Sequence, residues 1–549
     1  MNALPQRTAW LLSVAVNLLL GAVWLLAEPI LDSRDDFFLL YLLSGGWGNA
    51  PTELLHYKYG LSPLLTKPLA LLFTAAPHFN WYTGLLLACM YSSGVVLAGV
   101  LLLQQGIKKG LLLYGAFFAT ISCWLLLRIN FSGASLLLSM AAVALLYVQT
   151  ARHGRWWHYW PVVLLLVLAS LLRMHTVALV GVATAPLWLA VPLRQLLQQV
   201  IPALGTAAVL AVALHLWQVR YYQQHIPGWQ HENAYREALF AAVNSGRQYN
   251  HSLLAQQPAA VQLAARQFFI DFSVTNRQVL QQLATNRSLQ LPMQWKTTAS
   301  ILYWMATENK WPVLLLVLLW FWIAGAGTSR QRWIAVSTIA VTLLLLVVLR
   351  FALKLPPYLL LSLLGMAILV LLLQLPRQSG KQARQWMYLL LAVVVAGSSI
   401  SQLRAAKQLR YRAAAFETHL QALAADTQSI FLLLDRNISV SDFPARRAPA
   451  AYPLPHVLTQ AHFINGQSNA FFKRHHLVPD SLWHHPRLRV CMNDSASARQ
   501  HKAVLATYLH EKWGAAVSFE PALPQFAPLV VKPLQWHPAT HPLQAGSRH

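Results

Sequence analysis

Apolar runs of about 16 to 25 residues recur along the chain and alternate with polar loops. A helix of about 20 apolar residues crosses the hydrocarbon core of a bilayer. The runs therefore predict an α-helical polytopic membrane protein with about eleven transmembrane helices, at residues 10–27, 80–104, 110–127, 131–149, 157–172, 176–193, 197–217, 312–327, 333–350, 357–375 and 386–402. The first run follows Arg7 and has no small-residue cleavage site, so we expect it to be retained as a helix.

The stretch LLRMHTVAL, with Arg173 and His175, separates two of the shorter runs. It fits either a tight turn between two spans or one long kinked helix. The choice matters because merging the two runs would reverse every later loop.

Lysine and arginine then predict the orientation. With a cytoplasmic N-terminus and eleven spans, every inner loop carries basic residues, among them Lys108, Arg152, Arg194, Arg330 and Arg384. Merging the runs around Arg173 would put the later basic clusters outside, against the positive-inside rule. We therefore predict eleven spans, an inner N-terminus and an outer C-terminus.

This topology leaves two large outer loops, residues 28–79 and 218–311, and an outer tail after residue 403. The first loop contains two apolar stretches, DFFLLYLLSGG and LSPLLTKPLALLFTA, which are too short or too interrupted by proline to span. They suit helices in the plane of the interface.

The tail, residues 404–549, has the pattern of a small soluble α/β domain. A polar helix is expected near 404–425, then an apolar strand at SIFLLLD, and then a strand, helix and strand from LRVCMND to AVSFE. The chain thus divides into a membrane domain at 1–403 and this external domain.

Composition supports the membrane class: 56% of the 549 residues are hydrophobic and 11% charged. The net charge of +25 is spread through loops and forms no basic patch with interleaved aromatics, so nucleic acid is not the expected partner. Three cysteines, two of them inside apolar runs, build no disulfide framework.

All 17 acidic residues fall in predicted outer segments. Five are in the first loop: Glu28, Asp32, Asp35, Asp36 and Glu53. Acid–base catalysis by a carboxylate would therefore take place on the outer face. Asp35 and Asp36 start the first interfacial stretch and are the catalytic candidates. The alternative is helix capping, since Ser33 and Asp36 have the spacing of a capping box and acids favour a first helical turn. Both roles are compatible.

Basic side chains on the predicted outer face, at the ends of spans or in the first loop, run against the positive-inside bias and are candidates to bind a lipid phosphate. They are His56, Lys58, Arg128, Arg173, His175 and Arg350. Each one alone also fits a cation that reaches up to lipid headgroups.

Other site patterns are missing from the sequence. No phosphate-binding GxxxxGK[ST] loop, GxGxxG, CxxC or HExxH occurs, and the paired histidines at 475–476 and 484–485 have no carboxylate or cysteine arranged with them. We expect neither a metal site nor a cofactor.

The layout resembles the GT-C class of membrane glycosyltransferases: an inner N-terminus, a long first outer loop with acids just after the first helix, about eleven spans and an outer tail. The stretch from SRDDFFLLYLLSGG to HFNWYTGLLL also looks like the start of a poorly characterised bacterial group of polytopic proteins. The resemblance covers residues 1 to about 375 by layout.

The resemblance implies transfer of a sugar from a polyprenyl-phosphate carrier to an envelope glycan, lipid or protein acceptor, at the outer face of the cytoplasmic membrane. The acid–base or orienting role falls to Asp35 or Asp36, and binding of the carrier phosphate to the basic candidates. The sequence departs from the class after Arg173, where related proteins often have Arg-Pro. The alternative is a lipid or glycan transporter or a non-enzymatic envelope assembly protein.

Overall fold

The structure is a computed structural model. It describes residues 5–25, 27–55, 61–152, 156–244, 254–267, 277–285, 309–352, 355–376, 381–433, 442–459, 468–478, 481–491, 496–514, 516–523 and 531–537, with isolated residues at 299, 303–305 and 307.

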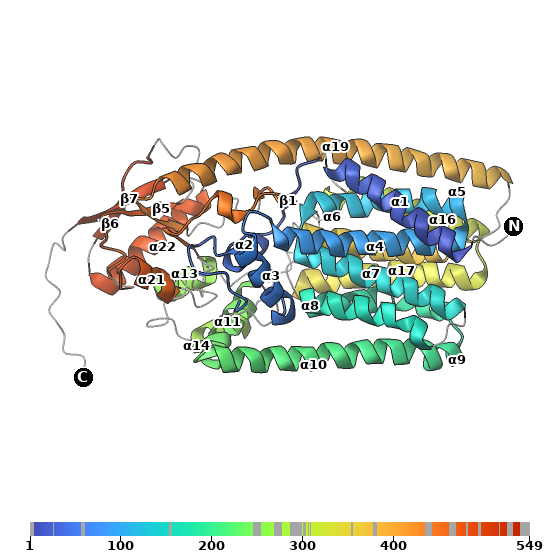
Figure 1. Cartoon of the computed structure of the whole chain (residues 1–549), viewed down its shortest axis with the longest axis horizontal. Helices are drawn as coiled ribbons and strands as arrows, with labels where there is room; N and C mark the ends of the chain where they lie inside the picture. The colour runs from blue at the N-terminus through green and yellow to red at the C-terminus, as the bar shows by residue number, and fades with distance from the viewer. Residues whose placement is uncertain are drawn as a thin grey trace.

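Long apolar helices form a bundle, with a mixed sheet beyond one end of it (Figure 1). The bundle consists of α1 (Gln6–Leu25), α4 (Trp81–Gln105), α5 (Ile107–Phe117) continuing through a π-helical turn into α6 (Cys123–Leu127), α7 (Phe131–Ala151), α8 (Trp160–Ala183), α9 (Leu193–Gln195) continuing into α10 (Ile201–His225), α16 (Lys310–Ala326), α17 (Ser329–Ala352), α18 (Pro357–Leu373) and α19 (Lys381–Ala425). Among the described residues, seven helices are long and apolar enough to cross a membrane, and three more apolar helices are shorter. The predicted α-helical polytopic fold is confirmed, and the count of eleven spans stays a prediction.

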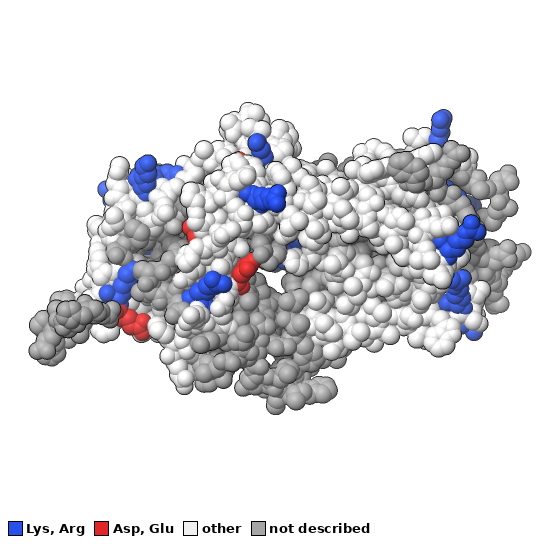
Figure 2. Space-filling view, turned by 90° about the horizontal axis from the view of Figure 1, so that it is seen from below, with Lys and Arg blue, Asp and Glu red and all other residues white. Residues whose placement is uncertain are grey.

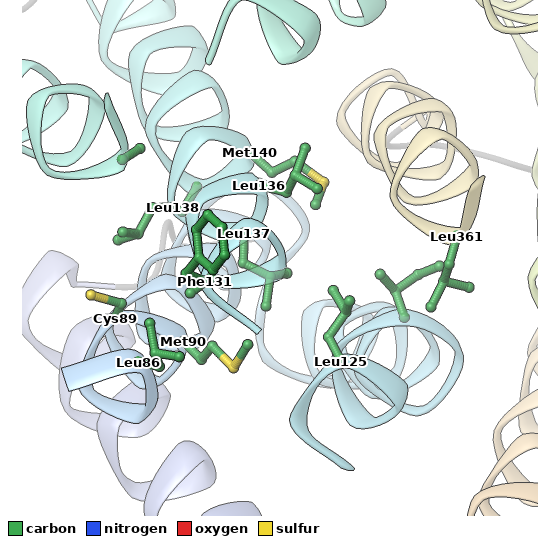
Figure 3. Close-up of a cluster of buried hydrophobic side chains, with 14 of the residues drawn as sticks. Leu86, Cys89, Met90, Leu125, Phe131, Leu136, Leu137, Leu138, Met140 and Leu361 are labelled. Carbon is green, nitrogen blue, oxygen red and sulfur yellow. The ribbon is translucent and has the colours of Figure 1, made fainter. Parts of the chain in front are cut away.

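Helix α7 lies inside the bundle, and nearly all of its side chains are buried. Figure 3 shows Phe131, Leu136, Leu137 and neighbouring α7 residues among side chains of α4, α6 and α18. A helix that is apolar all round is covered either by other helices or by lipid, and neighbouring helices cover α7. Because the rest of the bundle packs around it, the N-terminus of α7 has a fixed place.

The chain reverses direction inside α8. Arg173 has an extended backbone (φ −163°, ψ 104°) that interrupts the helix. Its carbonyl accepts a hydrogen bond from Ser135 near the start of α7 at 3.3 Å, whereas Trp188 contacts Tyr147 near the end of α7 with ring centroids 6.5 Å apart. The two halves around Arg173 therefore run in opposite directions, as the positive-inside argument predicted for this turn.

Basic residues gather at the end of the bundle where α1 starts. The loops there meet: Lys109 donates to the Pro376 carbonyl at 2.8 Å, and Arg330 donates to the Leu189 carbonyl at 2.6 Å. Figure 2 shows this end, on the right, with basic residues and no acidic ones on the visible face, while both signs occur towards the other end. The asymmetry matches the predicted orientation, in which this end is cytoplasmic.

The first loop contains the two expected short helices, α2 (Arg34–Ser44) and α3 (Pro63–Ala75). The prediction that both lie in the membrane interface is wrong for α2, whose residues from Asp36 to Leu43 are all buried inside the protein. Phe37 packs against Trp47 of the same loop and against Phe416 and Phe443 from the last quarter of the chain. Sequence reasoning missed this cover because it comes from a segment about 400 residues away.

The boundary predicted between residues 403 and 404 falls inside one continuous helix, because α19 runs without interruption through 45 residues, and the division into two domains stays a prediction. No proline or glycine interrupts the chain there, so the apolar span and the polar helix continue into each other. Beyond it, the strands β3 (Ile430–Leu433), β4 (Val457–Thr459), β5 (Leu488–Cys491), β6 (Ala516–Phe519) and β7 (Val531–His537) form one sheet in the order β4-β3-β5-β7-β6.

Strands β3, β5 and β6 occur where the tail pattern predicted strands, and α22 (Ala496–Trp513) occurs where it predicted a helix, whereas β4 and β7 were not predicted. The sheet also packs with a helix of the second outer loop, α13 (Ala259–Gln267), whose first amide donates to the Glu511 carboxylate at 2.9 Å.

Residues 442–456, which we call the strap, connect the sheet to the end of the bundle. The strap pairs with β1 (Ile30–Leu31): the amide of Leu31 donates to the Phe443 carbonyl at 3.0 Å and that of Ala445 to the Pro29 carbonyl at 2.9 Å. Asn80, just before α4, donates to the carbonyls of Ala445 and Arg447, both at 2.9 Å. The strap thereby covers α2 and fixes the first loop against the bundle.

Candidate functional site

Asp36 lies at the centre of the end of the bundle that the strap covers. Its side chain is fully buried, and its Oδ1 accepts hydrogen bonds from the Tyr82 hydroxyl at 2.5 Å and from the Phe131 amide at 3.0 Å. The Ser33 hydroxyl donates to the other carboxylate oxygen. The carboxylate therefore joins the starts of three helices, α2, α4 and α7, and occupies the anion-favouring N-terminus of α7.

Burial raises the pKa of Asp36 to about 7, because the low-dielectric surroundings disfavour the ionised form. The hydrogen bonds from Ser33, Tyr82 and Phe131 oppose this shift, and the neighbouring Asp35 charge adds to it. Asp36 is therefore poised between its two protonation states near neutral pH.

The two catalytic candidates face different surroundings. The amide of Asp36 donates to the Ser33 hydroxyl at 3.0 Å, which is the predicted cap of α2. Asp35, in the same helical turn, is exposed. Only Asp35 of the pair is open to a substrate, whereas Asp36 is a fixed group behind it.

Arg173 reaches the same helix start from the other side. Its guanidinium donates to the Ser132 hydroxyl and to the Tyr358 hydroxyl, the latter at 3.4 Å, and lies over the Phe131 ring at 5.3 Å from the centroid. The reversal of the chain at Arg173 brings this cation to the end of the bundle instead of into its apolar middle. The Arg173 residue is partly exposed, and a guanidinium is a strong hydrogen-bond donor to anions.

Asp32 and Arg128 form a further pair of opposite charges at this end of the bundle, since Asp32 directly follows β1. β1 pairs in parallel with β2 (Arg128–Ile129), and this register sets Asp32 beside Asn130, whose amide group donates to the Asp32 carboxylate at 3.5 Å. The Arg128 guanidinium lies over the Trp124 ring at 4.7 Å. Burial raises the pKa of Asp32 to about 7, and the positive charge of Arg128 is the largest influence in the other direction.

A salt bridge from the tail borders this pair. Arg412 of α19 binds Asp442 of the strap through two hydrogen bonds, at 2.6 and 3.2 Å. Both charges influence Asp32: Arg412 lowers its pKa and Asp442 raises it. The first loop, the bundle and the tail therefore all contribute charged groups to one rim, which we call the outer rim: Asp32, Asp35, Asp36, Arg128, Arg173, Arg412 and Asp442.

Of the remaining predicted residues, only the side chain of His175 is described. It is exposed, two residues beyond Arg173, and the positive charge of Arg173 acts on it. His56 and Lys58 lie outside the described residues, as does the side chain of Arg350. Among the described residues, no group of three or more histidine, cysteine, aspartate or glutamate side chains is arranged to hold a metal ion.

Sequence reasoning missed Tyr82, Asn130, Arg412 and Asp442. Tyr82 and Asn130 could have been found from the sequence, because each stands at the start of a long apolar run, where polar groups cluster at the membrane boundary. The other two carried no such signal, because only the strap's return to β1 places them here.

The fold and the outer rim define an α-helical polytopic membrane protein with a cluster of acidic and basic side chains at one end of its bundle. No family model matches the chain, and no curated protein matches it. It is similar to the crystal structure of ArnT from Cupriavidus metallidurans bound to undecaprenyl phosphate, with 13% identity, a TM-score of 0.48 and coverage of 95% of this chain and 97% of that one. It is also similar to the apo structure of the same protein, with 14% identity, a TM-score of 0.40 and coverage of 96% and 98%.

Proposed function

We propose that the protein is a membrane glycosyltransferase that moves a sugar from a polyprenyl-phosphate carrier to an envelope glycan, lipid or protein acceptor on the outer face of the cytoplasmic membrane. The observation that carries the proposal is the outer rim itself. Two partly exposed arginines and an exposed carboxylate lie together at the boundary between an apolar bundle and a polar tail.

The carrier phosphate suits the two arginines. A polyprenyl chain remains in lipid, so its phosphate lies at headgroup level, where Arg128 and Arg173 end their spans. A guanidinium can donate two parallel hydrogen bonds to phosphate oxygens. The charge that develops on the departing phosphate would be stabilised there by groups already in place.

Asp35 is the carboxylate in this proposal that contacts the acceptor. The acceptor hydroxyl oxygen attacks the anomeric carbon, the bond from that carbon to the phosphate oxygen breaks, and the phosphate leaves with the electron pair. The hydroxyl proton passes to the Asp35 carboxylate. Asp36 is a positioning residue, since it fixes the turn that presents Asp35 and holds the helix start that Arg173 contacts.

Replacement of Asp35 tests this assignment. The Asp35→Asn variant keeps the size of the side chain but is not a proton acceptor of comparable strength, and it leaves the contacts of Asp36 in place. We expect glycan profiles of envelope preparations to lose one component in Asp35→Asn cells and to keep it with Glu520→Gln, an exposed tail carboxylate. An unchanged profile at normal protein level would exclude Asp35 as the catalytic carboxylate.

A further inference from the structure

Asp32 directly follows β1, which lies between β2 and the strap. β1 pairs with β2 on one side and, through the antiparallel bridge between Ile30 and Pro444, with the strap on the other. The amide of Leu31 donates to the Phe443 carbonyl at 3.0 Å, and Asp32 follows Leu31 while Asp442 precedes Phe443. The two acidic residues therefore flank a hydrogen-bonded pair, and the negative charge of Asp442 raises the pKa of Asp32.

Two arginines offset the like charges of Asp32 and Asp442. Arg412 is committed to Asp442, whose side chain is only 8% exposed, through the double hydrogen bond. Arg128 is the cation that lowers the pKa of Asp32 most, and it is also the group that we propose to bind the carrier phosphate. The balance of charge around Asp32 therefore depends on what Arg128 binds.

We infer that Asp32 takes up a proton from solvent when the phosphate of the carrier binds Arg128, so that donor binding at the outer rim is coupled to protonation of Asp32. The inference rests on the proposed function and deepens it. A bound phosphate brings a negative charge to Arg128 and offsets the cation that favours ionised Asp32. The Asp32 carboxylate would then experience three negative groups, Asp36, Asp442 and the phosphate, while Arg412 is already paired with Asp442.

The direction of the coupling follows from linkage. Burial already holds the pKa of Asp32 at about 7, so even a modest further rise carries it through the neutral range. A ligand that raises the pKa of a group binds more tightly to the protonated protein. Affinity should therefore fall with rising pH above about 7, by at most tenfold per pH unit.

The probe for the experiment is methyl farnesyl phosphate, a phosphate diester on a short polyprenyl chain. A diester avoids the second ionisation of a phosphate monoester, whose pKa of about 6 would itself exchange protons. Calorimetric titration of the full-length protein in two buffers of different ionisation enthalpy gives the number of protons taken up per ligand bound.

We expect the wild-type protein and the Glu520→Gln control to take up a substantial fraction of one proton near pH 7, and Asp32→Asn to bind the probe with no uptake. Asp442→Asn removes the opposing like charge, so its pH dependence should shift to lower pH. Uptake that persists in Asp32→Asn, or binding without any uptake in the wild type, would overturn the inference.

The result also separates this inference from the proposed function. Proton-coupled binding by a protein that fails to transfer sugar would contradict the proposed function and leave the inference standing. Binding without proton uptake by a protein that does transfer sugar would contradict the inference and leave the proposed function standing. Failure of the probe to bind at all, or equal binding by Arg128→Gln, contradicts the assignment of Arg128 and with it the inference.

Discussion

Asp36 and Arg173 contact consecutive residues at the start of one helix. The Asp36 carboxylate accepts from the amide of Phe131, while the Arg173 guanidinium donates to the hydroxyl of Ser132. An acid and a base that are 137 positions apart in the sequence are thus held on either side of the N-terminus of α7. Because α7 is buried along nearly its whole length, their separation is fixed by the core of the bundle.

Arg173→Lys should weaken donor binding by tenfold or more and also lower the turnover number, because the same guanidinium binds the carrier phosphate and stabilises the charge that develops on it. Lysine keeps the charge but lacks the planar fork that can donate to Ser132 and to a phosphate together. Steady-state kinetics with a varied polyprenyl donor check this. Unchanged kcat and KM would show that Arg173 does not contact the carrier phosphate.

Asp36→Ala should destabilise the protein by roughly 2–4 kcal/mol, since the buried hydroxyl of Tyr82 and amide of Phe131 each lose an acceptor. Asp36→Asn, which keeps a carbonyl oxygen, should cost less than half as much. Urea unfolding of the detergent-solubilised protein compares the two. Combining Asp36→Ala with Tyr82→Phe should cost less than the sum of the single changes, because the two side chains share one hydrogen bond.

The raised pKa of Asp36 makes a prediction about pH and stability. The unfolded chain ionises this group near its ordinary pKa of 3.8, whereas the folded protein keeps it protonated up to about 7. The folded state therefore holds more protons between these values, and the contribution of Asp36 to stability decreases as the pH rises from about 4 to 7.

Thermal unfolding at a series of pH values should show a smaller decrease for Asp36→Asn than for the wild type over this window. The exposed Glu520→Gln change serves as the control. Identical pH dependence in wild type and Asp36→Asn would mean that Asp36 ionises normally in the folded protein.

Asn80→Leu should loosen the strap, because the carbonyls of Ala445 and Arg447 lose their shared donor. Arg446 and Arg447 are trypsin sites within the strap, so limited proteolysis reports the change directly. We expect cleavage there to speed up several-fold in Asn80→Leu, with cleavage elsewhere unaffected. Cleavage at the wild-type rate would show that the pairing with β1 holds the strap without Asn80.

The bundle could be predicted from the sequence because the bilayer imposes a simple rule on helix length and on the sides where cations gather. The reversal at Arg173 is the clearest case: the basic loops that follow it required a turn there, although its own residues fit a kink equally well. Sequence also placed the acids of the first loop at the end of the bundle, and the capping of α2 by Ser33.

The arrangement of the candidate site at that end of the bundle could not be predicted from the sequence in the same way. Nothing in FFLLYLL distinguishes a helix covered by lipid from one covered by Phe416 and Phe443 of a distant segment. Likewise, the different exposure of Asp35 and Asp36 depends on the hydrogen bonds of Asp36 to Tyr82 of α4 and Phe131 of α7. Long-range pairing, such as that of the strap with β1, leaves no local pattern.

The most direct test of the central claim is consumption of a sugar-loaded polyprenyl-phosphate donor by the purified full-length protein in lipid nanodiscs, supplied with acceptor from an envelope extract. We predict release of free polyprenyl phosphate by the wild type and by Glu520→Gln, and a fall of at least a hundredfold in Asp35→Asn. Donor turnover by Asp35→Asn at the wild-type rate, or none by the wild type under conditions where the donor binds, would contradict the account.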